Sequence, residues 1–301
     1  MSYARRIVSK LLNEGYLKWM PDKMYLKLLW RARMHSKLNI NDPKTFNEKL
    51  QWLKLYDRKP EYTLMVDKYE AKKYVAEHIG EQYIIPTIGV WDHFDDINFE
   101  QLPDQFVLKC THDSGGLVVC RDKSKLDIDA ARKKIENSLR RNFFWYGREW
   151  PYKNIRPRII AEKYMEDDAT VTENRDSLNK ELIDYKFYCF SGEPKFLYVS
   201  EGLENHETAK ISFIDLDWKF APFHRNDYYT FDKLPKKPKS FDKMVQLSKK
   251  LSKGIPFIRV DLYEINGVIY FGELTFTPCS GLMLFSPQEW DYRIGQYLKL
   301  N

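Results

Sequence analysis

The clearest pattern of apolar and polar positions lies between residues 258 and 281, which read IRVDLYEINGVIYFGELTFTPCSG. Two runs of strand-forming residues flank Asn266-Gly267, a pair typical of tight hairpin turns. Asp261 and Glu273 interrupt these otherwise apolar runs. An ionised carboxylate is costly to bury unless a positive group meets it. The faces on which the two acids lie therefore decide whether they form a site.

Two loop lengths place these acids differently. A two-residue loop, 266–267, puts Glu273 on the apolar face and separates it from Asp261. A three-residue loop, 265–267, with its glycine in the left-handed position of a bulge, puts both carboxylates on one polar face. Because a slip of one residue exchanges the two faces of a strand, the apolar pattern favours the three-residue loop.

With the three-residue loop, Arg259 lies opposite Glu273. Two carboxylates that are close together repel each other unless a cation lies between them, and hard oxygen ligands suit Mg²⁺. An Arg259–Glu273 ion pair beside an unrelated Asp261 explains the hairpin equally well. The hairpin pattern alone leaves both interpretations open.

The rest of the chain predicts a mixture of helices and strands. A capping box at residues 45–48 opens a helix that continues to about Tyr56. Asp67 is expected to cap a second helix that ends near Gly80. Further helices are expected over 127–141, from 240 to 251 and after residue 287. Strands are expected over 83–91, 106–110, 117–120, 158–165, 184–190 and 194–200. Since these elements follow no regular strand–helix–strand repeat, the pattern predicts an α+β fold.

Composition narrows the class of protein. The chain has 301 residues, of which 43% are hydrophobic, so it can bury a sizeable core. No apolar run approaches the roughly 20 residues of a membrane-spanning helix, and the basic N-terminus lacks the apolar region of a signal peptide. The four cysteines form no C-x-x-C pair and lie in apolar or strand-like sequence. We therefore expect mostly buried thiols in a reducing compartment, which indicates a cytoplasmic protein.

Charge is concentrated at the N-terminus. Residues 1–40 hold nine Lys and Arg against two acidic residues, a formal charge of +7, whereas the whole chain carries +6. Apolar positions at 7–12 and 25–30 predict two basic amphipathic helices in this N-terminal arm. Such helices often lie on anionic membrane surfaces, so we expect a peripheral contact with the inner face of the membrane. A helical cap packed on the body, with a solvated basic face, is the alternative.

A lysine and two glycines follow one another in the stretch FVLKCTHDSGG. Lys109 lies near the end of an apolar strand, and Gly115-Gly116 follow it. Glycine lets backbone N–H groups approach a phosphate closely, and a lysine holds a phosphate as a point charge. The spacing matches neither the P-loop nor the dinucleotide-binding fingerprint. A hairpin turn beside a surface lysine is the alternative.

Two further lysines stand in suggestive positions. Lys68 opens a helix, where ordinary solvation also explains it. Lys186 alternates along a strand with Asp184 and Tyr188, on a polar face that we expect to point away from the core. An edge-strand lysine explains Lys186 as well.

Taken together and in order, these pieces resemble an ATP-grasp enzyme. The chain is most similar to the TupA-like ATP-grasp family through FNEKLQWLKLYDR, DYKFYCFSGEPKF and GELTFTPCSG. The resemblance extends from about residue 45 to the C-terminus and implies an ATP-grasp fold behind a basic helical extension. It divides the chain into an extension over 1–60, an N-terminal part over 61–165 and a C-terminal part over 166–301.

The resemblance implies an ATP site. It assigns to the nucleotide Lys68, Lys109, His112, Ser114, Gly115, Gly116, Glu162, Lys163, Tyr164 and Met165. In this set the lysines hold phosphates, residues 112–116 form a lid, and residues 162–165 line the adenine.

The resemblance also implies catalytic and metal-binding residues. Lys186 faces the phosphates, and Arg259 stabilises the transferring phosphoryl group or the tetrahedral intermediate. Asp261 and Glu273 bind Mg²⁺. Thr275 stands where the wider superfamily has an asparagine ligand, and a hydroxyl is a poorer ligand than an amide oxygen, so the second metal position departs from the pattern.

The implied reaction is amide formation through an acyl phosphate. A uronic acid of a capsular or cell-wall polysaccharide, or its precursor, supplies the carboxylate, and an amino acid supplies the amine. Arg148 and Tyr152 are candidate carboxylate binders, although a packed aromatic turn also explains them. A kinase that phosphorylates a sugar hydroxyl, and a non-catalytic basic adaptor, are the alternatives. We expect no nucleic-acid partner.

Overall fold

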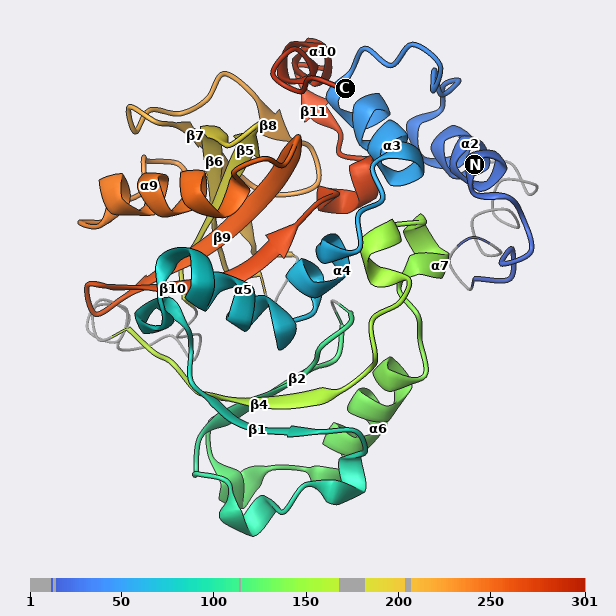
Figure 1. Ribbon diagram of the computed structural model, residues 1–301. Helices are drawn as coiled ribbons and strands as arrows, with labels where there is room; N and C mark the ends of the chain where they lie inside the picture. The colour runs from blue at the N-terminus through green and yellow to red at the C-terminus, as the bar shows by residue number, and fades with distance from the viewer. Residues whose placement is uncertain (1–11, 13–14, 114, 168–181, 204–206, 301) are drawn as a thin grey trace. The chain divides into compact units, whose positions relative to one another are not determined.

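The chain is arranged as two compact units, described here from a computed structural model. The structure describes residues 12, 15–113, 115–167, 182–203 and 207–300. Unit 1 comprises Met1–Arg58, Tyr146–Arg148 and Glu166–Asn301, and unit 2 comprises Lys59–Trp145 and Glu149–Met165. Each unit combines helices with an antiparallel sheet (Figure 1), which confirms the predicted α+β class. The predicted domain boundaries stay a prediction.

Unit 1 is built on a five-stranded sheet with the order β10-β9-β5-β6-β7. Its strands are β5 (Asp184–Phe190), β6 (Glu193–Glu201), β7 (Lys210–Asp215), β9 (Phe257–Ile265) and β10 (Val268–Thr275). A short pair, β8 (His224–Arg225) and β11 (Phe285–Ser286), forms a second small sheet. The strand β7 was not expected from the sequence.

Helices cover the large sheet of unit 1. Helix α9 (Phe241–Ser252) packs against β5, β6 and β9 (Figure 1). An aromatic cluster on the sheet includes Tyr188, Phe196 and Phe213, and it takes in Phe46 from α3 (Phe46–Tyr56). Helix α10 (Glu289–Gly295) and the 3₁₀ turn η6 (Pro278–Gly281) both pack against α3. The capping box that opens α3 is present, as predicted.

The N-terminal arm contains one described helix, α2 (Asp22–Met34). Tyr25, Leu26, Leu29 and Trp30 are buried on one side of it, which confirms the second predicted amphipathic helix. The first predicted helix, at residues 7–12, lies almost wholly outside the described residues.

Unit 2 holds a four-stranded antiparallel sheet with the order β1-β4-β2-β3. Its strands are β1 (Thr87–Trp91), β2 (Phe106–Cys110), β3 (Leu117–Cys120) and β4 (Ile159–Lys163). Helix α6 (Ile128–Leu139) packs on β2 and β3 over a core that includes Phe106, Leu108 and Ile135. The short helix α7 (Phe144–Gly147) lies where the chain passes from unit 2 to unit 1.

Two helices open unit 2. Helix α4 (Glu61–Val66) was not expected, and α5 (Glu70–Ile79) matches the second predicted helix. The Asp67 carboxylate accepts hydrogen bonds from the backbone N–H groups of Tyr69 and Glu70. Gly80 ends the helix with a positive φ of 117°, a conformation that favours glycine. The remaining 3₁₀ turns of unit 2 are η1 (Glu81–Tyr83), η2 (Phe94–Asp96), η3 (Phe99–Gln101), η4 (Lys123–Lys125) and η5 (Trp150–Tyr152).

The β9–β10 hairpin differs from the predicted register. Its loop is Asn266-Gly267 alone, with φ values of 52° and 78°, so the three-residue loop was wrong. A bulge lies between Phe271 and Glu273, and beyond it Glu273 pairs with Asp261 and Thr275 with Arg259, so the prediction that Arg259 lies opposite Glu273 was wrong. Neither of the two loops considered from the pattern contained this bulge.

The bulge reconciles the two faces of the hairpin. Phe271 pairs with Leu262, whereas Glu273 returns to the face of Asp261. The extra residue is Gly272, where a Cβ atom would lie only 3.0 Å from the Tyr263 ring. The shared face of the two carboxylates is therefore confirmed, although the device that produces it is different.

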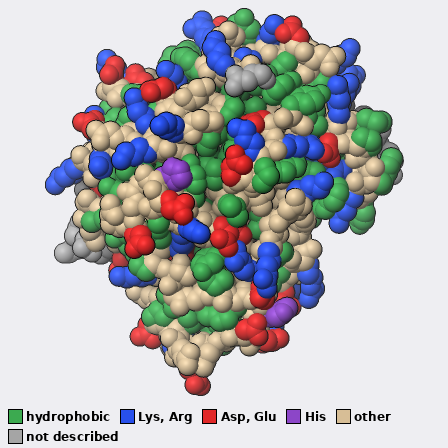
Figure 2. Space-filling view, viewed as in Figure 1, with side chains coloured by type: hydrophobic (Ala, Val, Ile, Leu, Met, Phe, Trp, Pro, Cys, Tyr) green, Lys and Arg blue, Asp and Glu red, His purple; other side chains and the backbone are tan. Residues whose placement is uncertain are grey.

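The cysteines and the surface charges were also compared with their sequence expectations. Cys110, Cys120 and Cys189 are buried and Cys279 is exposed, which matches the expectation of mostly buried thiols. Within the described part of the chain, no helix has the length and apolar character needed to cross a membrane. On the face seen in Figure 2, acidic and basic side chains are interspersed among apolar ones.

Candidate functional site

A network of charged side chains lies on one face of the unit 1 sheet, and we call it the hairpin cluster. It comprises Asp184, Lys186, Arg259, Asp261 and Glu273. The guanidinium of Arg259 donates from Nε to Asp261 Oδ1 and from Nη2 to Asp261 Oδ2, both at 2.7 Å. The same Nη2 donates to Glu273 Oε1 at 2.6 Å. The ammonium of Lys186 bonds Asp261 Oδ2 at 2.7 Å and pairs with Asp184 at 3.0 Å.

Neighbouring strands bring these residues together. Lys186 on β5 is the cross-strand partner of Asp261 on β9, and Asp261 is the partner of Glu273 on β10. Three adjacent strands thus contribute one charged residue each to a single row. Because strand partners lie about 5 Å apart, the backbone register alone places these side chains in contact.

Burial makes this network electrostatically strong. Asp261 is fully buried, whereas the side chain of Glu273 is 41% exposed. Burial raises the pKa of Asp261 to about 6, although Arg259 and Lys186 act in the opposite direction. Burial opposes the charge of Lys186, but Asp184 and Asp261 outweigh it and raise its pKa. The cluster holds one more carboxylate than cations, so it favours an added positive charge.

The structure corrects the sequence interpretation of Lys186. Lys186 is buried, at 7% exposure, and β5 is the central strand of the sheet. Lys186 is therefore neither an edge-strand lysine nor directed away from the core. An alternating pattern identifies the shared face with Asp184 and Tyr188 but does not say what covers that face.

A polar stripe on α3 holds the loop that follows the hairpin. Asn47, Gln51 and Lys54 follow one another at helical spacing and are all buried. Gln51 Nε2 donates to the carbonyls of Ser280 and Gly281 at 3.0 and 2.7 Å. Lys54 Nζ donates to the carbonyl and the hydroxyl of Ser280 at 2.7 and 2.9 Å.

This support matters because the loop is conformationally unusual. Cys279, Ser280 and Gly281 have consecutive positive φ values of 51°, 55° and 63°. Residues other than glycine adopt such angles at a cost of about 1–3 kcal/mol each, and only where the surroundings enforce them. The α3 stripe provides that enforcement, and the sequence interpretation missed Gln51 and Lys54. Their i, i+3 spacing in FNEKLQWLK was the available signal.

Unit 2 contains a second charged group, the lysine cluster, formed by Lys72, Lys109 and Glu162. Glu162 on β4 pairs with Lys72 through Oε1 at 2.5 Å and with Lys109 through Oε2 at 2.6 Å. Lys72 Nζ also donates to the carbonyl of Ile85 at 2.8 Å. Burial opposes the charge of Glu162, but the two lysines outweigh it and lower its pKa. Lysine exceeds carboxylate here, so the cluster favours an anion.

The sequence interpretation placed Glu162 at an adenine hinge and did not single out Lys72. Nothing in the lysine-rich helix that carries Lys72 distinguishes it from its neighbours, because its partner lies 90 residues further along the chain. Arg158, which pairs with Asp67 at 3.2 Å and Glu70 at 2.8 Å, was missed for the same reason.

The predicted lid segment is anchored at both described ends. His112 Nε2 lies 3.1 Å from the carbonyls of Ser138 and Arg141. The Asp113 carboxylate accepts from the Gly116 N–H at 3.1 Å and from the Ser138 hydroxyl. Lys68 Nζ donates to the Asp113 carbonyl. Ser114 lies outside the described residues, and the role of the segment as a lid stays a prediction.

The two glycines of this segment differ. A Cβ atom on Gly116 would lie 2.5 Å from the Ser138 hydroxyl and 2.6 Å from Cys110 Sγ, so the packing demands glycine there. A Cβ atom on Gly115 would meet only Asp113, at 3.8 Å. Space rather than backbone freedom is the requirement, and it applies to Gly116.

Residues after Glu162 lie beside a surface cavity of about 790 Å³. Lys163 and Tyr164 line it, together with Ile88, Gln105 and Arg121. Consecutive strand residues point to opposite faces, so Lys163 and the cavity lie on the other face of β4 from Glu162. The assignment of Lys163, Tyr164 and Met165 to adenine stays a prediction.

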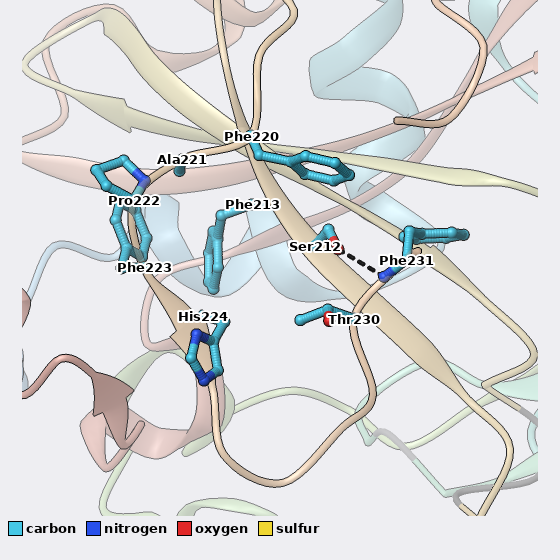
Figure 3. A pocket seen from close by; sticks show the side chains of 9 residues that line it. All are labelled: Ser212, Phe213, Phe220, Ala221, Pro222, Phe223, His224, Thr230 and Phe231. Carbon is cyan, nitrogen blue, oxygen red and sulfur yellow. Dashed lines mark hydrogen bonds between the residues drawn. The ribbon is translucent and has the colours of Figure 1, made fainter. Parts of the chain in front are cut away.

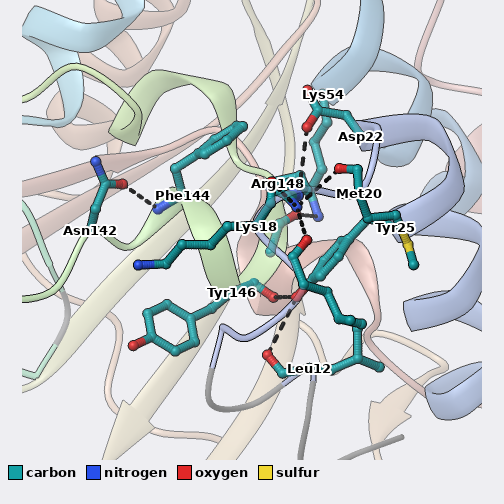
Figure 4. A network of polar contacts seen from close by, with 12 residues as sticks. Leu12, Lys18, Met20, Asp22, Tyr25, Lys54, Asn142, Phe144, Tyr146 and Arg148 are labelled. Atoms are coloured by element: carbon teal, nitrogen blue, oxygen red, sulfur yellow. Dashed lines mark hydrogen bonds and ion pairs between the residues drawn. The ribbon is translucent and has the colours of Figure 1, made fainter.

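Arg148 takes a structural position in unit 1 (Figure 4). Arg148 is fully buried. Its Nη2 donates to the carbonyls of Leu17 at 2.7 Å and Met20 at 3.3 Å, and its guanidinium stacks 4.3 Å from the Tyr25 ring. Asp22 pairs with its Nε at 3.5 Å. These contacts fasten the N-terminal arm, and carboxylate binding by Arg148 stays a prediction.

Tyr152 belongs to unit 2 and packs its ring edge-to-face on Phe143 at 5.1 Å. This contact matches the aromatic packing that was the alternative for this stretch. A carboxylate-binding role for Tyr152 stays a prediction.

A smaller cavity in unit 1, of about 230 Å³, is lined mainly by aromatic side chains (Figure 3). Phe213, Phe220, Phe223 and His224 are among them. None of its lining residues is Lys, Arg, Asp or Glu, so it lacks the charges that a phosphate or metal ion requires.

The hairpin cluster fits a metal ion by the chemistry of its donors. Among the described residues no group of three or more His, Cys, Asp or Glu side chains is arranged to hold a metal. Mg²⁺ is commonly bound by one or two carboxylates together with substrate phosphates, so Asp261 and Glu273 suffice in number. Metal binding at Asp261 requires that Arg259 or Lys186 exchange a contact, since these cations occupy both of its oxygens.

The family model described as TupA-like ATPgrasp matches residues 48–299. No curated protein matches the chain.

Three of the similar solved structures are ligases or synthetases. The D-alanine–D-alanine ligase from Helicobacter pylori is 14% identical, with a TM-score of 0.44, over 85% of this chain and 68% of that one. The ligase of the same name from Bacillus anthracis, complexed with ATP, is 15% identical, with a TM-score of 0.42, over 71% of this chain. N5-carboxyaminoimidazole synthetase from Staphylococcus aureus is 15% identical, with a TM-score of 0.38, over 70% of this chain. The chain spans 55% of the length of the Bacillus enzyme and 44% of the synthetase.

Proposed function

The chain belongs to the TupA-like ATP-grasp family, and from this premise we propose that it is an ATP-dependent carboxylate–amine ligase. A carboxylate oxygen attacks the γ-phosphorus of ATP, which releases ADP and forms an acyl phosphate. The amine then attacks the acyl carbon, and the phosphate leaves with that oxygen as an amide forms. The observation that carries the proposal is the hairpin cluster, with its excess of carboxylate beside a buried arginine.

The hairpin cluster supplies the metal-binding and transition-state residues in this proposal. Asp261 and Glu273 hold Mg²⁺, which neutralises phosphate charge. Arg259 stabilises the transferring phosphoryl group, and Lys186 keeps Asp261 ionised and oriented through their 2.7 Å bond. Phosphoryl transfer depends mostly on positioning and charge neutralisation, which are the two things that such a cluster provides.

The lysine cluster supplies phosphate binding. Lys109 binds the phosphates of ATP as a point charge, and so does Lys68, whose Nζ contacts the Asp113 carbonyl. Glu162 holds Lys72 and Lys109 in place through its two oxygens. Residues 162–165 contribute backbone groups to adenine binding. An acyl phosphate hydrolyses readily, so the segment 112–116 is assigned the exclusion of water.

The substrates in this proposal are a uronic acid of a capsular or cell-wall polysaccharide, or its precursor, and an amino acid. The family resemblance supports this choice, and the basic N-terminal arm supports a peripheral contact with an anionic membrane. A lipid-linked or polymeric acceptor would be drawn to the same arm.

The proposal is tested by ADP release across a panel of uronic acids paired with amino acids. The acid that supports turnover is then labelled with heavy oxygen in its carboxylate. Transfer of the label to inorganic phosphate, together with an amide product, is the expected result. A stable phosphomonoester would identify a kinase and overturn the ligase, and so would phosphate that carries no label.

A further inference from the structure

Arg225 on β8 is a buried cation that the proposed reaction does not use. Its residue is 8% exposed, and its Nε and Nη2 donate to the two oxygens of Asp227 at 2.9 and 2.6 Å. The guanidinium stacks 4.7 Å from the Tyr228 ring. Within the described part of the chain, Nη1 makes no hydrogen bond, so one end of this fork has donors to offer.

Tyr188 on β5 carries the second observation. Its side chain is fully buried, yet its hydroxyl has no hydrogen-bond partner among the described residues. Burial raises the pKa of this hydroxyl, so it is protonated at neutral pH and available as a donor. A buried polar group left unpaired costs about 1–3 kcal/mol, which a bound acceptor would recover.

These two groups lie in one electrostatic neighbourhood. Tyr188 is the cross-strand partner of Arg259 in the hairpin cluster. The Phe213 ring lies 5.9 Å from the Tyr188 ring and 6.1 Å from the Phe285 ring, and Phe285 is the cross-strand partner of Arg225. The charge of Arg225 accordingly acts to lower the pKa of Tyr188, and Cys279 acts on the pKa of both groups. Cys279 is exposed, so this neighbourhood reaches the protein surface at the loop that the α3 stripe supports.

We propose that Arg225 and the Tyr188 hydroxyl bind a carboxylate of one of the substrates, an inference that rests on the proposed ligase function. Arginine pairs with a carboxylate through its planar fork, as the bidentate contact with Asp227 already demonstrates in this site. The Asp227 side chain is 54% exposed, so water can satisfy it when a substrate carboxylate takes a share of the guanidinium.

Neighbouring residues favour a carboxylate over a phosphate. The Tyr188 hydroxyl and the Nη1 group of Arg225 are two donor groups, one for each oxygen of a carboxylate, whereas a phosphoryl group has a third oxygen to satisfy. The Arg225 charge is already balanced by Asp227, so the site favours an anion of small charge. Two substrates can supply that group, namely the acid that is activated and an amino acid that serves as the amine.

The test measures binding to the full chain in the presence of ADP and Mg²⁺ by calorimetry. The probes are L-alanine, L-glutamate, L-lysine, glucuronate and galacturonate, each compared with the corresponding carboxamide. At least one acid is expected to bind about tenfold more tightly than its carboxamide. Preference in the amino-acid arm identifies the amine substrate as the source of the carboxylate, and preference in the uronate arm identifies the activated acid.

Two variants then assign that preference to the proposed residues. Tyr188→Phe and Arg225→Lys are each expected to weaken binding of the preferred acid about tenfold and to leave its carboxamide unchanged. Tyr185→Phe, on the same strand and the opposite face, is the matched control and should keep the preference. An acid–carboxamide preference absent from the unmodified protein, or retained in both variants, overturns the inference.

A stability measurement separates ligand binding from a structural role. Tyr188→Phe removes a hydroxyl that has no described partner, so the melting temperature should stay the same or rise. A clear fall would show that the hydroxyl supports the fold and would overturn the inference. ATP titration of the same variants keeps the two proposals apart, because intact ATP binding without acid preference leaves the ligase standing, whereas failure of ATP to bind the unmodified protein contradicts the ligase itself.

Discussion

The hairpin cluster and the lysine cluster are both networks of charged side chains on antiparallel sheets, but their charge balance is opposite. The hairpin cluster encloses two cations with three carboxylates, and Asp261 at its centre is fully buried. The lysine cluster surrounds one carboxylate, Glu162, with two lysines. An excess of carboxylate suits a metal ion, whereas an excess of lysine suits phosphate.

The comparison indicates that the same arrangement, a buried charged strand residue surrounded by opposite charges, can suit either a metal ion or a phosphate. In both clusters a buried strand residue is the hub, and cross-strand neighbours or a packed helix supply its partners. A buried ion pair gains little stability on balance, because desolvation offsets most of the attraction. In the proposed function both clusters serve ligand binding rather than stability, and each can be tested by substitution.

The largest effect is expected at Arg259 in the hairpin cluster. Arg259→Lys keeps the positive charge beside Asp261 and Glu273 but loses the bidentate geometry, so ADP release should fall about a thousandfold. ATP affinity and the melting temperature should change little. Arg293→Lys, at an exposed ion pair of α10 in the same unit, is the control. Turnover within a few-fold of the unmodified protein would remove Arg259 from the mechanism.

The next largest effect is expected at Glu162, the central carboxylate of the lysine cluster. Glu162→Gln leaves two lysines without their carboxylate, so the free energy of unfolding should fall by about 3 kcal/mol at neutral pH. Since the lysines lower the pKa of Glu162, its contribution is present above the ordinary value of 4.5 and disappears as the pH falls below it.

Denaturant titrations across this pH range provide the measurement. The difference between Glu162→Gln and the unmodified protein should shrink below the ordinary pKa of a glutamate. Glu100→Gln, at an exposed position of unit 2, controls for the loss of charge alone. A difference that is independent of pH would show that packing, rather than charge, is what the substitution removes.

A smaller effect is expected from the α3 stripe. Gln51→Ala removes two hydrogen bonds to the loop at residues 280–281, so ADP release should fall about tenfold as the loop loses its left-handed conformation. Gln246→Ala, on an exposed position of α9, should be neutral. Equal activity of the two variants would mean that the loop keeps its conformation without the stripe.

The smallest effect is expected from the N-terminal arm. Replacing Arg31 and Arg33 of α2 by glutamine should weaken binding to vesicles of anionic lipid about fivefold at low salt, and less at higher salt because charges are screened. The matched double substitution by lysine keeps the charge and should bind normally. Binding that does not respond to charge or salt would identify the arm as a packed cap.

Much of the fold was accessible from the sequence because local patterns determine it. The capping box at Thr45, the turn at Gly80 and the alternation in β2 each depend on residues that are close in the chain. The wrong loop in the β9–β10 hairpin has a specific cause. A bulge at Gly272 exchanges faces within one strand, and strict alternation cannot represent it.

The candidate site was accessible only in part. Asp261, Glu273 and Arg259 lie on one hairpin, so their contact follows from a short stretch of sequence. Burial of Lys186 and the pairing of Lys72 with Glu162 depend on strand order and on a helix packed from far along the chain. These long-range relations leave no periodic trace, which is why only the folded chain reveals them.

The measurement that tests the central claim most directly is ATP binding with and without Mg²⁺. We expect the unmodified protein to bind ATP at least about tenfold more tightly with Mg²⁺, because Asp261 and Glu273 hold the metal together with the phosphates. Asp261→Asn and Glu273→Gln should each abolish that gain and leave metal-free ATP binding nearly unchanged. The same Mg²⁺ dependence in both variants, or no binding of ATP to the unmodified protein, would contradict the account.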